Sequence, residues 1–292
     1  MKRLYRMLSK EQLGAFALDI KKKKELSALS DTFIVEQIKV YLQKEPKTAQ
    51  QLTEKFNTKS AIYRETLKRI REKLRRSYGL FRAQNHPLEL LTHYDNATAN
   101  EQSQILHQML ETHSSTKERL ATYKMLYSSI FATTGKPSSI LDLACGVNPL
   151  SLPLMNLKKV HYFAYDINTA EIDLLNQFFA KYHQHHCSFH GQAAVFDLHQ
   201  IDKIPQLPSA DVAFLWKIVD VLDANRGHTK SEAVIKAVPA KWVVVSFATK
   251  TMSGKAMTAP KRRWMEWMCK RLGYEYSILE YDNEIFYMVK KN

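Results

Sequence analysis

The sequence contains no apolar run of the roughly 20 residues that a membrane-spanning helix needs. Residues 212–222 form an apolar stretch, but Lys217 and Asp220 interrupt it. The first ten residues are basic and lead into no hydrophobic signal core. These absences argue against a transmembrane or exported protein, and we expect a cytoplasmic one.

Cysteine is also scarce, and the three cysteines lie at positions 145, 187 and 269. Their uneven spacing matches neither a disulfide framework nor a zinc motif. Four histidines surround the second cysteine, at positions 183, 185, 186 and 190. No carboxylate joins them at a metal-ligand spacing, so we interpret this segment as a polar loop and expect no metal.

Positive charge is in excess, and it is concentrated in the first quarter of the chain. The net charge is +14, and residues 1–76 contain 20 Lys or Arg against 9 Asp or Glu. A basic region joined to a nearly neutral one favours a polyanionic partner, nucleic acid before an acidic membrane. The simpler alternative is a solvated surface that only aids solubility.

The N-terminal region is predicted to be helical. Asp31 is a candidate N-cap for a helix that ends at Pro46, and a shorter helix opens at Thr48. Residues 60–78 form a longer amphipathic helix with one apolar stripe. The neighbouring stripe is basic, and we predict that it binds RNA through Arg64, Lys68, Arg71, Arg75 and Arg76.

Two helices around a short turn, the second of them basic, would also fit a helix-turn-helix that reads the DNA major groove. Because the turn lacks the usual glycine, the preferred interpretation is a helical bundle whose basic face lies on phosphates. Residues 84–112 are polar and suggest a junction. We therefore expect a basic helical domain at 1–105 and a second domain at 106–292.

The second domain is organised around residues 138–151, SSILDLACGVNPLS. An apolar run with Asp142 leads into a tight turn at Gly146, and a second strand ends at Asp166, twenty residues later. A turn after the first strand and an acid after the second are typical of doubly wound nucleotide-binding folds, where the acid binds ribose hydroxyls. Only one of the usual three glycines is present, so a pyrophosphate has no cradle. S-adenosyl-L-methionine carries no phosphate and fits better.

Three further strands are predicted at residues 193–196, 211–216 and 241–247. The third strand is followed by Asp197 and Leu198, a carboxylate for an adenine amino group and an apolar cover for the ring. Lys217 and Lys250 follow the fourth and fifth strands. Since ligands of open α/β sheets bind at the carboxyl ends of strands, we expect these side chains at one edge.

The C-terminal part closes the predicted sheet. Residues 260–271 read as a helix with Trp264, Trp267 and Met268 on one side. Residues 274–281 and 284–289 alternate as the two strands of an antiparallel hairpin.

Residues 113–119, HSSTKER, precede a helical segment and the first strand. Ser115 or Thr116 with Glu118 is typical of a helix start, which is the simpler reading. The more specific interpretation concerns Arg119, whose guanidinium is placed to pair bidentately with the methionine carboxylate of the cofactor.

The segments HSSTKER, ILDLACGVNPL, AYDI, the strand end at Lys217, SFATKTMSGK and EIFYMVKK together resemble the aminoglycoside-resistance 16S ribosomal RNA methyltransferases of the Arm/Rmt type. The resemblance runs from about residue 26 to residue 291. It implies an α/β, Rossmann-like class I methyltransferase fold with a mostly parallel sheet, a C-terminal antiparallel hairpin and an N-terminal helical domain. It also implies methyl transfer to N7 of guanosine 1405 of 16S rRNA, with the basic helices docked on the assembled 30S subunit. We expect a monomer.

The same resemblance assigns the carboxylate of the cofactor to Arg119, its methionine end to the turn at 144–146, its ribose to Asp166 and the active-site wall to Lys217. The predicted cofactor-binding residues are Arg119, Asp142, Ala144, Gly146, Asp166, Ile167, Asp197 and Leu198. The predicted catalytic residues are Lys217, Lys250, Ser253 and Lys255.

The predicted chemistry needs few groups. Guanine N7 carries a lone pair and no proton, so no general base is required, and catalysis consists of positioning a flipped base. Trp216 is either a stacking partner of that base or a buried side chain at a strand end. An Asn-Pro-Pro-Tyr-like motif and a Pro-Cys nucleophile, which serve other methyltransferase chemistries, are absent.

The sequence departs from the family pattern after the fifth strand. Where the family usually shows Gly-Met-Glu-x-Asn-Tyr, residues 256–261 read AMTAPK. This loop lies near the target base in the family, so another RNA base is an alternative target. A non-catalytic RNA- or ribosome-binding protein is the other alternative, against which the retained Arg119, Asp142, Asp166 and Asp197 argue.

Overall fold

The computed structural model describes residues 8–75, 87–223, 227–251 and 254–292. The chain forms two compact units, Met1–Arg82 with Ile167–Thr169, and Ala83–Asp166 with Ala170–Asn292. The domain boundary expected between residues 105 and 106 falls inside helix α6 (Ala99–Leu110), which belongs to the second unit. In the described parts of the chain, no helix is long and apolar enough to span a membrane.

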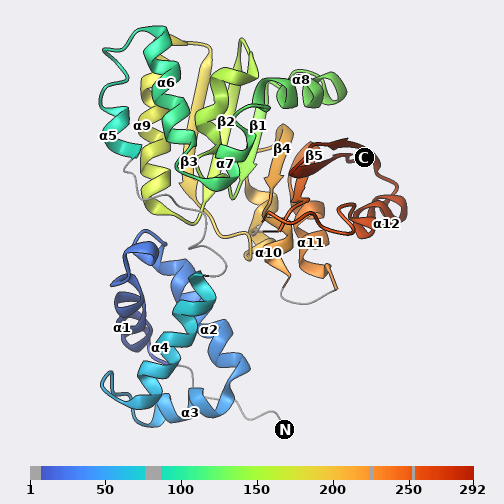
Figure 1. The fold of residues 1–292 in the computed structure, drawn as a ribbon. Coiled ribbons are helices and arrows are strands. Elements are labelled where there is room, and N and C mark those ends of the chain that lie inside the picture. The colour runs from blue at the N-terminus through green and yellow to red at the C-terminus, as the bar shows by residue number, and fades with distance from the viewer. Residues whose placement is uncertain (1–7, 76–86, 224–226, 252–253) are drawn as a thin grey trace. The chain divides into compact units, whose positions relative to one another are not determined.

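The first unit is a helical bundle of α1 (Lys10–Lys21), the 3₁₀ helix η1 (Lys24–Leu26), α2 (Asp31–Lys44), α3 (Pro46–Glu54) and α4 (Ala61–Leu74) (Figure 1). Its core is built from apolar residues at helical spacing, among them Phe16, Ile34 and Tyr63. Phe16 and Tyr63 stack with ring centroids 4.1 Å apart.

Two helix starts in this unit differ from expectation. Ser30, rather than Asp31, is the N-cap of α2, because its hydroxyl accepts a hydrogen bond from the Phe33 N–H at 3.3 Å. Helix α3 begins at Pro46, two residues before the predicted Thr48, since proline is favoured in the first turn of a helix. The expected end of the helix over 60–78 lies outside the described residues.

The second unit begins with α5 (Pro87–Leu91), α6, α7 (Ser114–Arg119) and α8 (Tyr123–Thr134). The strands are β1 (Ser139–Leu143), β2 (Val160–Asp166), β3 (Phe189–Val195), β4 (Ala210–Trp216), β5 (Ala240–Ala248), β6 (Glu275–Glu280) and β7 (Glu284–Lys290). They are connected by η3 (Asn148–Met155), α9 (Thr169–His185), η4 (Ile201–Gln206), α10 (Val219–Leu222), α11 (Thr229–Ala237) and α12 (Arg263–Leu272).

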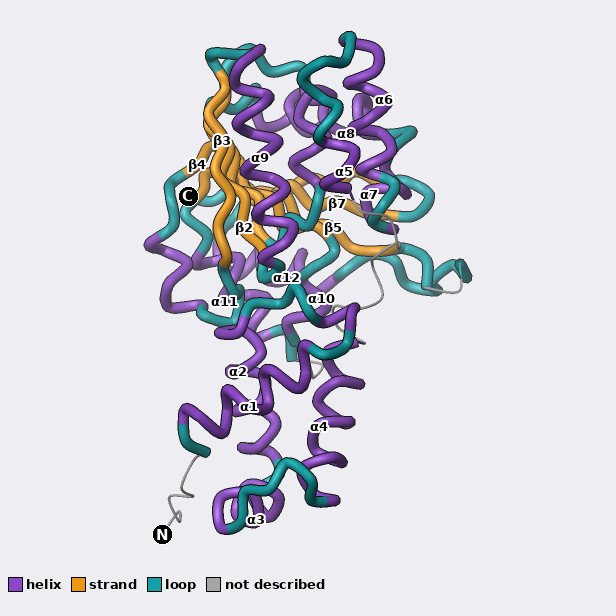
Figure 2. Tube along the Cα trace, turned by 90° about the vertical axis from the view of Figure 1, so that its left-hand side faces the viewer, coloured by secondary structure: helices purple, strands orange, loops and turns teal. Residues whose placement is uncertain are grey.

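The seven strands form one sheet in the order β3-β2-β1-β4-β5-β7-β6 (Figures 1 and 2). The first five are parallel, and β7 pairs antiparallel with both β5 and β6. The predicted parallel sheet with a closing antiparallel hairpin is therefore confirmed. The strand order reverses between β1 and β4, which is the topological switch point where doubly wound sheets bind ligands.

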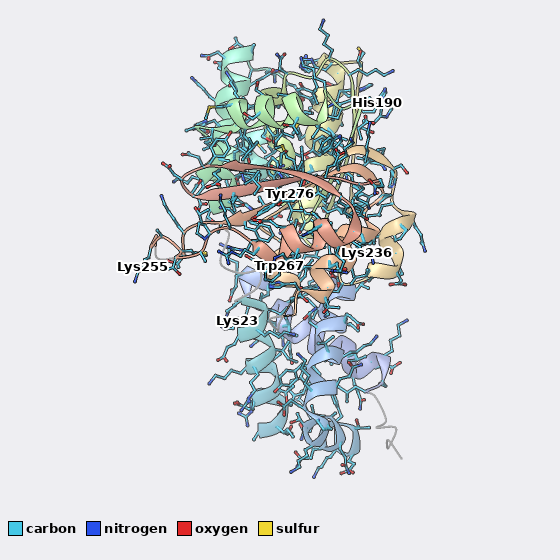
Figure 3. The ribbon with its side chains drawn as sticks, turned by 90° about the vertical axis from the view of Figure 1, so that its right-hand side faces the viewer. Lys23, His190, Lys236, Lys255, Trp267 and Tyr276 are labelled. Carbon is cyan, nitrogen blue, oxygen red and sulfur yellow. The ribbon has the colours of Figure 1, made fainter. Side chains whose placement is uncertain are left out.

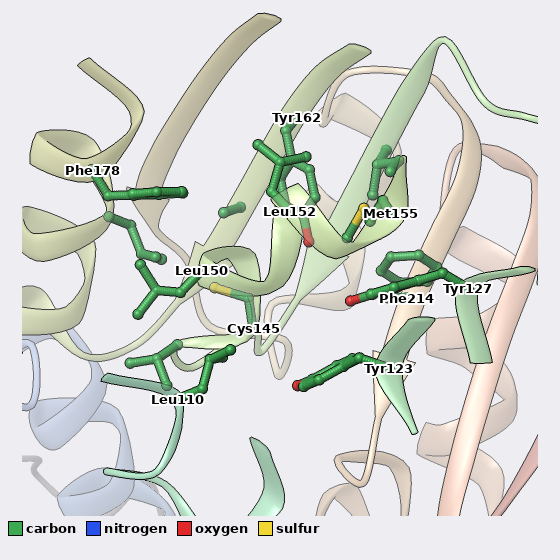
Figure 4. Close-up of a cluster of buried hydrophobic side chains, with 14 of the residues drawn as sticks. Leu110, Tyr123, Tyr127, Cys145, Leu150, Leu152, Met155, Tyr162, Phe178 and Phe214 are labelled. Carbon is green, nitrogen blue, oxygen red and sulfur yellow. The ribbon is translucent and has the colours of Figure 1, made fainter. Parts of the chain in front are cut away.

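Alternate residues of each strand face two separate cores. On β4, Phe214 packs with the cluster formed by α6, α8 and α9, whereas Leu215 packs with the cluster formed by α11 and α12. Figure 4 shows part of the first cluster, where Tyr123 and Tyr127 of α8 lie beside Phe214. Helices cover both faces of the sheet, so its carboxyl edge is the side left for a ligand.

Two element boundaries in this unit also differ from the sequence analysis. Strand β3 begins at Phe189, four residues before the predicted start, and its pairing with β2 runs from Val160 to Asp166. Helix α12 begins at Arg263 rather than at residue 260. Its apolar side holds Met265, Met268 and Cys269, while Trp267 is 69% exposed, so the predicted grouping of Trp267 with Met268 is wrong.

Candidate functional site

The predicted site residues of the sheet lie in or directly after parallel strands. Asp142 belongs to β1 and Asp166 ends β2, while Asp197 lies two residues beyond β3. Lys217 follows β4 directly, and Lys250 lies two residues after β5. Because the carboxyl ends of these parallel strands share one edge, the topology brings the five residues to the same side of the sheet.

The turn after β1 is held against the end of β2. The Gly146 N–H donates to Oδ2 of Asp166 at 3.0 Å, and the Cys145 N–H donates to the Tyr165 carbonyl at 3.1 Å. Ala144 and Gly146 have φ values of 55° and 50°. A Cβ on Gly146 would lie 3.3 Å from Nδ1 of His113. Glycine is therefore favoured there by the backbone conformation, and an added Cβ would press on the side chain of His113.

The ends of β1 and β4 both carry a strained backbone. Ala144 and Lys217 are non-glycine residues with a φ of 55°, in the left-handed region that costs energy for residues with a Cβ. The Lys217 N–H donates to both the carbonyl and the hydroxyl of Ser246, at 3.1 and 3.0 Å, which holds this conformation in place. Such strain concentrates at functional sites.

Asp142 is buried in a polar network beneath the turn. Its Oδ2 accepts hydrogen bonds from Nδ2 of Asn148 at 2.8 Å and from the Tyr162 hydroxyl at 2.7 Å. The Tyr123 hydroxyl in turn donates to Oδ1 of Asn148 at 2.9 Å. Burial raises the pKa of Asp142 to about 6, against the lowering effects of Asn148, Tyr162 and Arg119. A carboxylate in this position is thus poised to gain from a cationic partner.

One carboxylate oxygen of Asp197 is hydrogen-bonded, and the other has no hydrogen-bond partner among the described residues. Its Oδ1 accepts from the backbone N–H of His199 and lies 2.9 Å from the ring Nδ1 of the same residue. Its Oδ2 is buried and has no hydrogen-bond partner among the described residues. A buried, unpaired carboxylate oxygen is costly, so this atom indicates a ligand that donates a hydrogen bond here.

Arg119 is buried, and two nitrogens on one side of its guanidinium are hydrogen-bonded within the protein. Its Nε and Nη2 donate to the two carboxylate oxygens of Glu284, at 2.8 and 2.7 Å, and its guanidinium lies 4.7 Å from the centre of the Trp216 ring. Burial alone lowers the pKa of Arg119, but Glu284 and Tyr123 more than offset this, so its pKa is raised. The pair with Glu284 uses Nε and Nη2, so Nη1 is the guanidinium nitrogen that this pair does not occupy.

Lys217 joins the same network. Its Nζ pairs with Oε2 of Glu118 and lies 3.7 Å from Oε2 of Glu284. The side chains of the other two predicted catalytic lysines, Lys250 and Lys255, are exposed on the loop after β5. In that loop, the Thr251 N–H donates to the Lys255 carbonyl at 2.8 Å, and the Lys255 N–H donates to Oγ1 of Thr251 at 3.2 Å. Ser253 lies outside the described residues.

Trp216 is a buried side chain at the end of β4. It is 7% exposed and packs against Tyr127, Phe214 and Phe286, with the Arg119 guanidinium over its ring. Of the two roles weighed from the sequence, the structure favours the buried strand-end residue over a stacking partner for a flipped base.

The remaining predicted cofactor residues differ in their surroundings. Leu198 is buried in the core cluster that contains Leu143 and Tyr165. Ile167 clusters with the first unit, where it packs against the hydrophobic core of that unit.

The predicted RNA-binding stripe on α4 is divided. Arg64 and Lys68 are exposed. Arg71 donates to the carbonyl of Asp19, and Nε of Arg75 donates to Glu25 at 2.6 Å, so both are tied within the unit. Arg76 lies outside the described residues.

The histidine-rich segment carries ring stacking instead of a metal arrangement. His161 and His190 are register partners on β2 and β3, with ring centroids 5.0 Å apart, and His183 lies 5.2 Å from His190. Within the described residues, no three His, Cys, Asp or Glu side chains are placed to hold a metal ion.

Three polar residues of the site were missed by the sequence analysis, namely Glu284, Asn148 and Tyr123. Glu284 had one visible signal, because it is the acid that opens an otherwise apolar strand, EIFYMV. Asn148 lies in the turn beside Pro149, where an asparagine is expected for turn geometry alone. Tyr123 lies on the apolar side of α8 and gave no signal of its own.

The family model described as Ribosomal RNA methyltransferase (FmrO) matches residues 38–288. The 16S rRNA (guanine(1405)-N(7))-methyltransferase of Frankia casuarinae is 28% identical over 185 residues, 62% of this chain and 62% of that protein. The enzyme of the same name from Micromonospora echinospora is 29% identical over 236 residues, 78% of this chain and 83% of that protein.

A solved structure shares the fold over nearly the whole chain. The 16S rRNA methyltransferase RmtF, solved in complex with S-adenosyl-L-homocysteine, superposes with a TM-score of 0.73 at 22% identity. The superposition covers 98% of this chain and all of that one. This likeness confirms the predicted class I α/β fold with an N-terminal helical region.

Proposed function

Because this chain belongs to the ribosomal RNA methyltransferase (FmrO) family, we propose that it methylates N7 of guanosine 1405 of 16S rRNA in the assembled 30S subunit. S-adenosyl-L-methionine is the methyl donor, and the modification confers aminoglycoside resistance. The family match over residues 38–288 confirms the resemblance inferred from the motifs. The names of the relatives supply the target, and the geometry of the second unit supports the methyl donor.

The observation that most directly supports this donor is the unpaired Oδ2 of Asp197. An adenine amino group donates the hydrogen bond that this buried oxygen lacks, and the apolar Leu198 follows it to cover the ring. The Gly146–Asp166 contact adds a backbone turn beside a carboxylate at the end of β2, where ribose hydroxyls bind in doubly wound folds.

Two groups are proposed to bind the methionine end of the donor. The Nη1 side of Arg119 binds the carboxylate, because Glu284 takes the opposite side of the guanidinium. Asp142 favours the ammonium group, since a nearby cation lowers the cost of keeping this buried acid ionised. The turn at Ala144–Gly146, with positive φ at Ala144 and Gly146, is proposed to lie along the methionine end.

The bound donor supplies a methyl group already activated by its sulfonium. The protein therefore has to orient the base and exclude water, because guanine N7 carries no proton to be removed. Lys217 is proposed to line the target side, held by Glu118 and Glu284 at the end of β4. Lys250, Ser253 and Lys255 on the following loop are proposed to contact the target nucleotide.

The helices of the predicted domain 1–105 are proposed to dock on the 30S subunit. Arg64 and Lys68 are the two exposed cations of the predicted stripe on α4, whereas Arg71 and Arg75 are bound within the unit. Exposed cations bind phosphates without reading sequence, which suits a folded RNA surface. The partner is thus 16S rRNA in its assembled subunit.

The proposal is tested by incubating the protein with labelled S-adenosyl-L-methionine and either purified 30S subunits or free 16S rRNA. We expect label in the 30S subunits and little in the free RNA. Expression in a susceptible bacterium should raise the inhibitory concentration of an aminoglycoside that binds at guanosine 1405. Equal labelling of free RNA, or no labelling of either, would contradict the proposal.

Replacing Asp197 should weaken donor binding. In Asp197→Asn, the side-chain NH₂ must face either the His199 N–H or the adenine amino group, and each arrangement sets donor against donor. We expect the Kd for S-adenosyl-L-methionine to rise about tenfold, corresponding to roughly 1.4 kcal/mol. Calorimetric titration measures this. Asp202→Asn, at an exposed position of η4, is the matched control, and an unchanged Kd for Asp197→Asn would remove Asp197 from the adenine site.

The two exposed cations of α4 should govern 30S affinity. With Arg64→Gln and Lys68→Gln combined, two phosphate contacts are lost, so we expect weaker binding and a shallower dependence of affinity on salt, by about 1.5 in the logarithmic slope. Filter binding at several salt concentrations measures both. Lys124→Gln combined with Lys136→Gln, which removes two exposed cations of the second unit, controls for net charge. A slope unchanged by the double substitution would argue against docking through this stripe.

A further inference from the structure

The outer side of α12 presents an exposed tryptophan. Trp267 is 69% exposed, although tryptophan is normally largely buried. The helix does not need this side chain for packing, because Met265, Met268 and Cys269 fill its buried side. Figure 3 shows Trp267 on α12, with Tyr276 of the neighbouring strand β6 on the same face. Tyr276 is 40% exposed, and these two are the exposed aromatic rings among the described large apolar residues.

Cations flank Trp267 along the helix. Arg263 lies four residues before it and Lys270 three residues after it, so all three share one side of α12. Both cations are exposed, and no ion pair involving them is found among the described residues. Their neighbours Arg262 and Arg271 differ, because they pair with Asp220 at 3.0 Å and with Glu232 at 2.5 Å. We call Arg263, Trp267 and Lys270 the α12 stripe.

The charge of α12 and the residues before it indicates what kind of partner this surface binds. Residues 261–272 contain five Lys or Arg and one Glu, which favours a polyanion over a protein surface, since protein interfaces are depleted in lysine at their centres. A membrane surface would need an apolar helix face, and the apolar face of α12 is buried against the sheet. An aromatic ring between cations is the arrangement that binds single-stranded nucleic acid, with a base on the ring and phosphates on the cations.

We infer that the α12 stripe is a second RNA-binding site, in which Trp267 stacks on an unpaired base of 16S rRNA and Arg263 and Lys270 bind the adjacent phosphates. This inference rests on the proposed function, because it takes the 30S subunit as the partner. It adds a contact made by the second unit itself. The site is independent of the predicted stripe on α4 and of the donor-binding residues.

Binding of 30S subunits without methyl donor tests the inference. We expect Trp267→Ala to weaken 30S affinity at least about fivefold, because stacking of one base on an aromatic ring contributes that much or more. Trp267→Phe should bind within twofold of the wild type, since it keeps a ring for stacking. Met125→Ala, which removes an apolar side chain of 58% exposure on α8, should have no effect. The Kd for S-adenosyl-L-methionine should be the same in all variants.

Crosslinking identifies the partner directly. A protein with the photoreactive p-benzoyl-phenylalanine in place of Trp267 should crosslink to 16S rRNA in 30S subunits. A crosslink to a ribosomal protein, or a Trp267→Ala affinity within twofold of the wild type, would overturn the inference. If the wild-type protein itself does not bind 30S subunits, the proposed function fails. If the wild type binds and Trp267→Ala binds equally well, only the α12 stripe is disproved.

Discussion

Glu284→Ala is expected to lower the free energy of unfolding by about 3–5 kcal/mol, because it leaves the buried Arg119 without its partner. The Glu284 and Arg119 side chains are 1% and 4% exposed and make a bidentate pair, so solvent cannot replace the lost carboxylate. Urea denaturation measures the loss. Glu275→Ala removes the exposed pair with Lys290 and should cost less than about 1 kcal/mol.

A second pair of variants separates the structural role of Glu284 from its role in the site. In Arg119→Met with Glu284→Leu, neither member of the buried pair is left without its partner, so most of the lost stability should return. Binding of S-adenosyl-L-methionine should not return, because the cation proposed for its carboxylate is gone. A double variant that binds the donor normally would show that the pair only stabilises the fold.

Asp142→Asn is expected to stabilise the donor-free protein at neutral pH and to weaken donor binding. The pKa of Asp142 is about 6 in the folded protein, against an ordinary value of 3.8. Keeping it ionised above pH 6 therefore costs about 3 kcal/mol of stability, as an upper estimate. Asparagine removes this cost and keeps an oxygen to accept from Asn148 and Tyr162.

The dependence on pH identifies this origin. Because the folded pKa is raised, the contribution of Asp142 to stability is fully present below pH 3.8 and is lost as the pH rises through about 6. The variant should accordingly exceed the wild type in stability at pH 8, with the difference shrinking to near zero at pH 4. Urea denaturation at both values measures it. An equal difference at both pH values would assign the effect to packing instead.

The sequence predicts those parts of the site that depend on residues close together in the chain. Asp142, Asp166 and Asp197 each come within two residues of the end of an apolar strand, and parallel strands carry such positions to one edge of the sheet. The turn at Gly146 is predicted for the same reason, because it directly follows the first apolar strand. The hairpin of β6 and β7 followed from the alternation of residues 274–281 and 284–289.

The parts that sequence does not predict depend on contacts between distant segments. Arg119 and Glu284 are 165 residues apart, and nothing in HSSTKER indicates that its arginine is already half engaged by a carboxylate. The same holds for α4, where Arg71 and Arg75 share the spacing of Arg64 but are bound to Asp19 and Glu25 of other helices. Periodicity gives the side of a helix on which a residue lies, and the neighbouring elements decide what that side contacts.

For Trp267 the sequence pattern predicted an apolar, buried side chain, but the side chain is exposed. Its spacing from Trp264 suggested a shared apolar side, but three residues in a helix correspond to about 300° of rotation, which leaves room for one residue to be buried and the other exposed. Trp264 is partly buried and stacks on His228 at 4.5 Å, whereas Trp267 faces solvent. The sequence pattern predicts the same surroundings for both tryptophans. Only the packing of α12 on the sheet shows that one is partly buried and the other exposed.

The position of the methylated base tests the central claim most directly. 30S subunits treated with the protein and S-adenosyl-L-methionine would be extracted, and their 16S rRNA reduced and cleaved with aniline, which cuts at N7-methylguanosine. We expect a single new cleavage at guanosine 1405, absent when Arg119→Met with Glu284→Leu replaces the wild type. Labelled RNA without cleavage at 1405, or cleavage at another guanosine, would contradict the account and direct attention to residues 256–261, where the sequence departs from the family pattern.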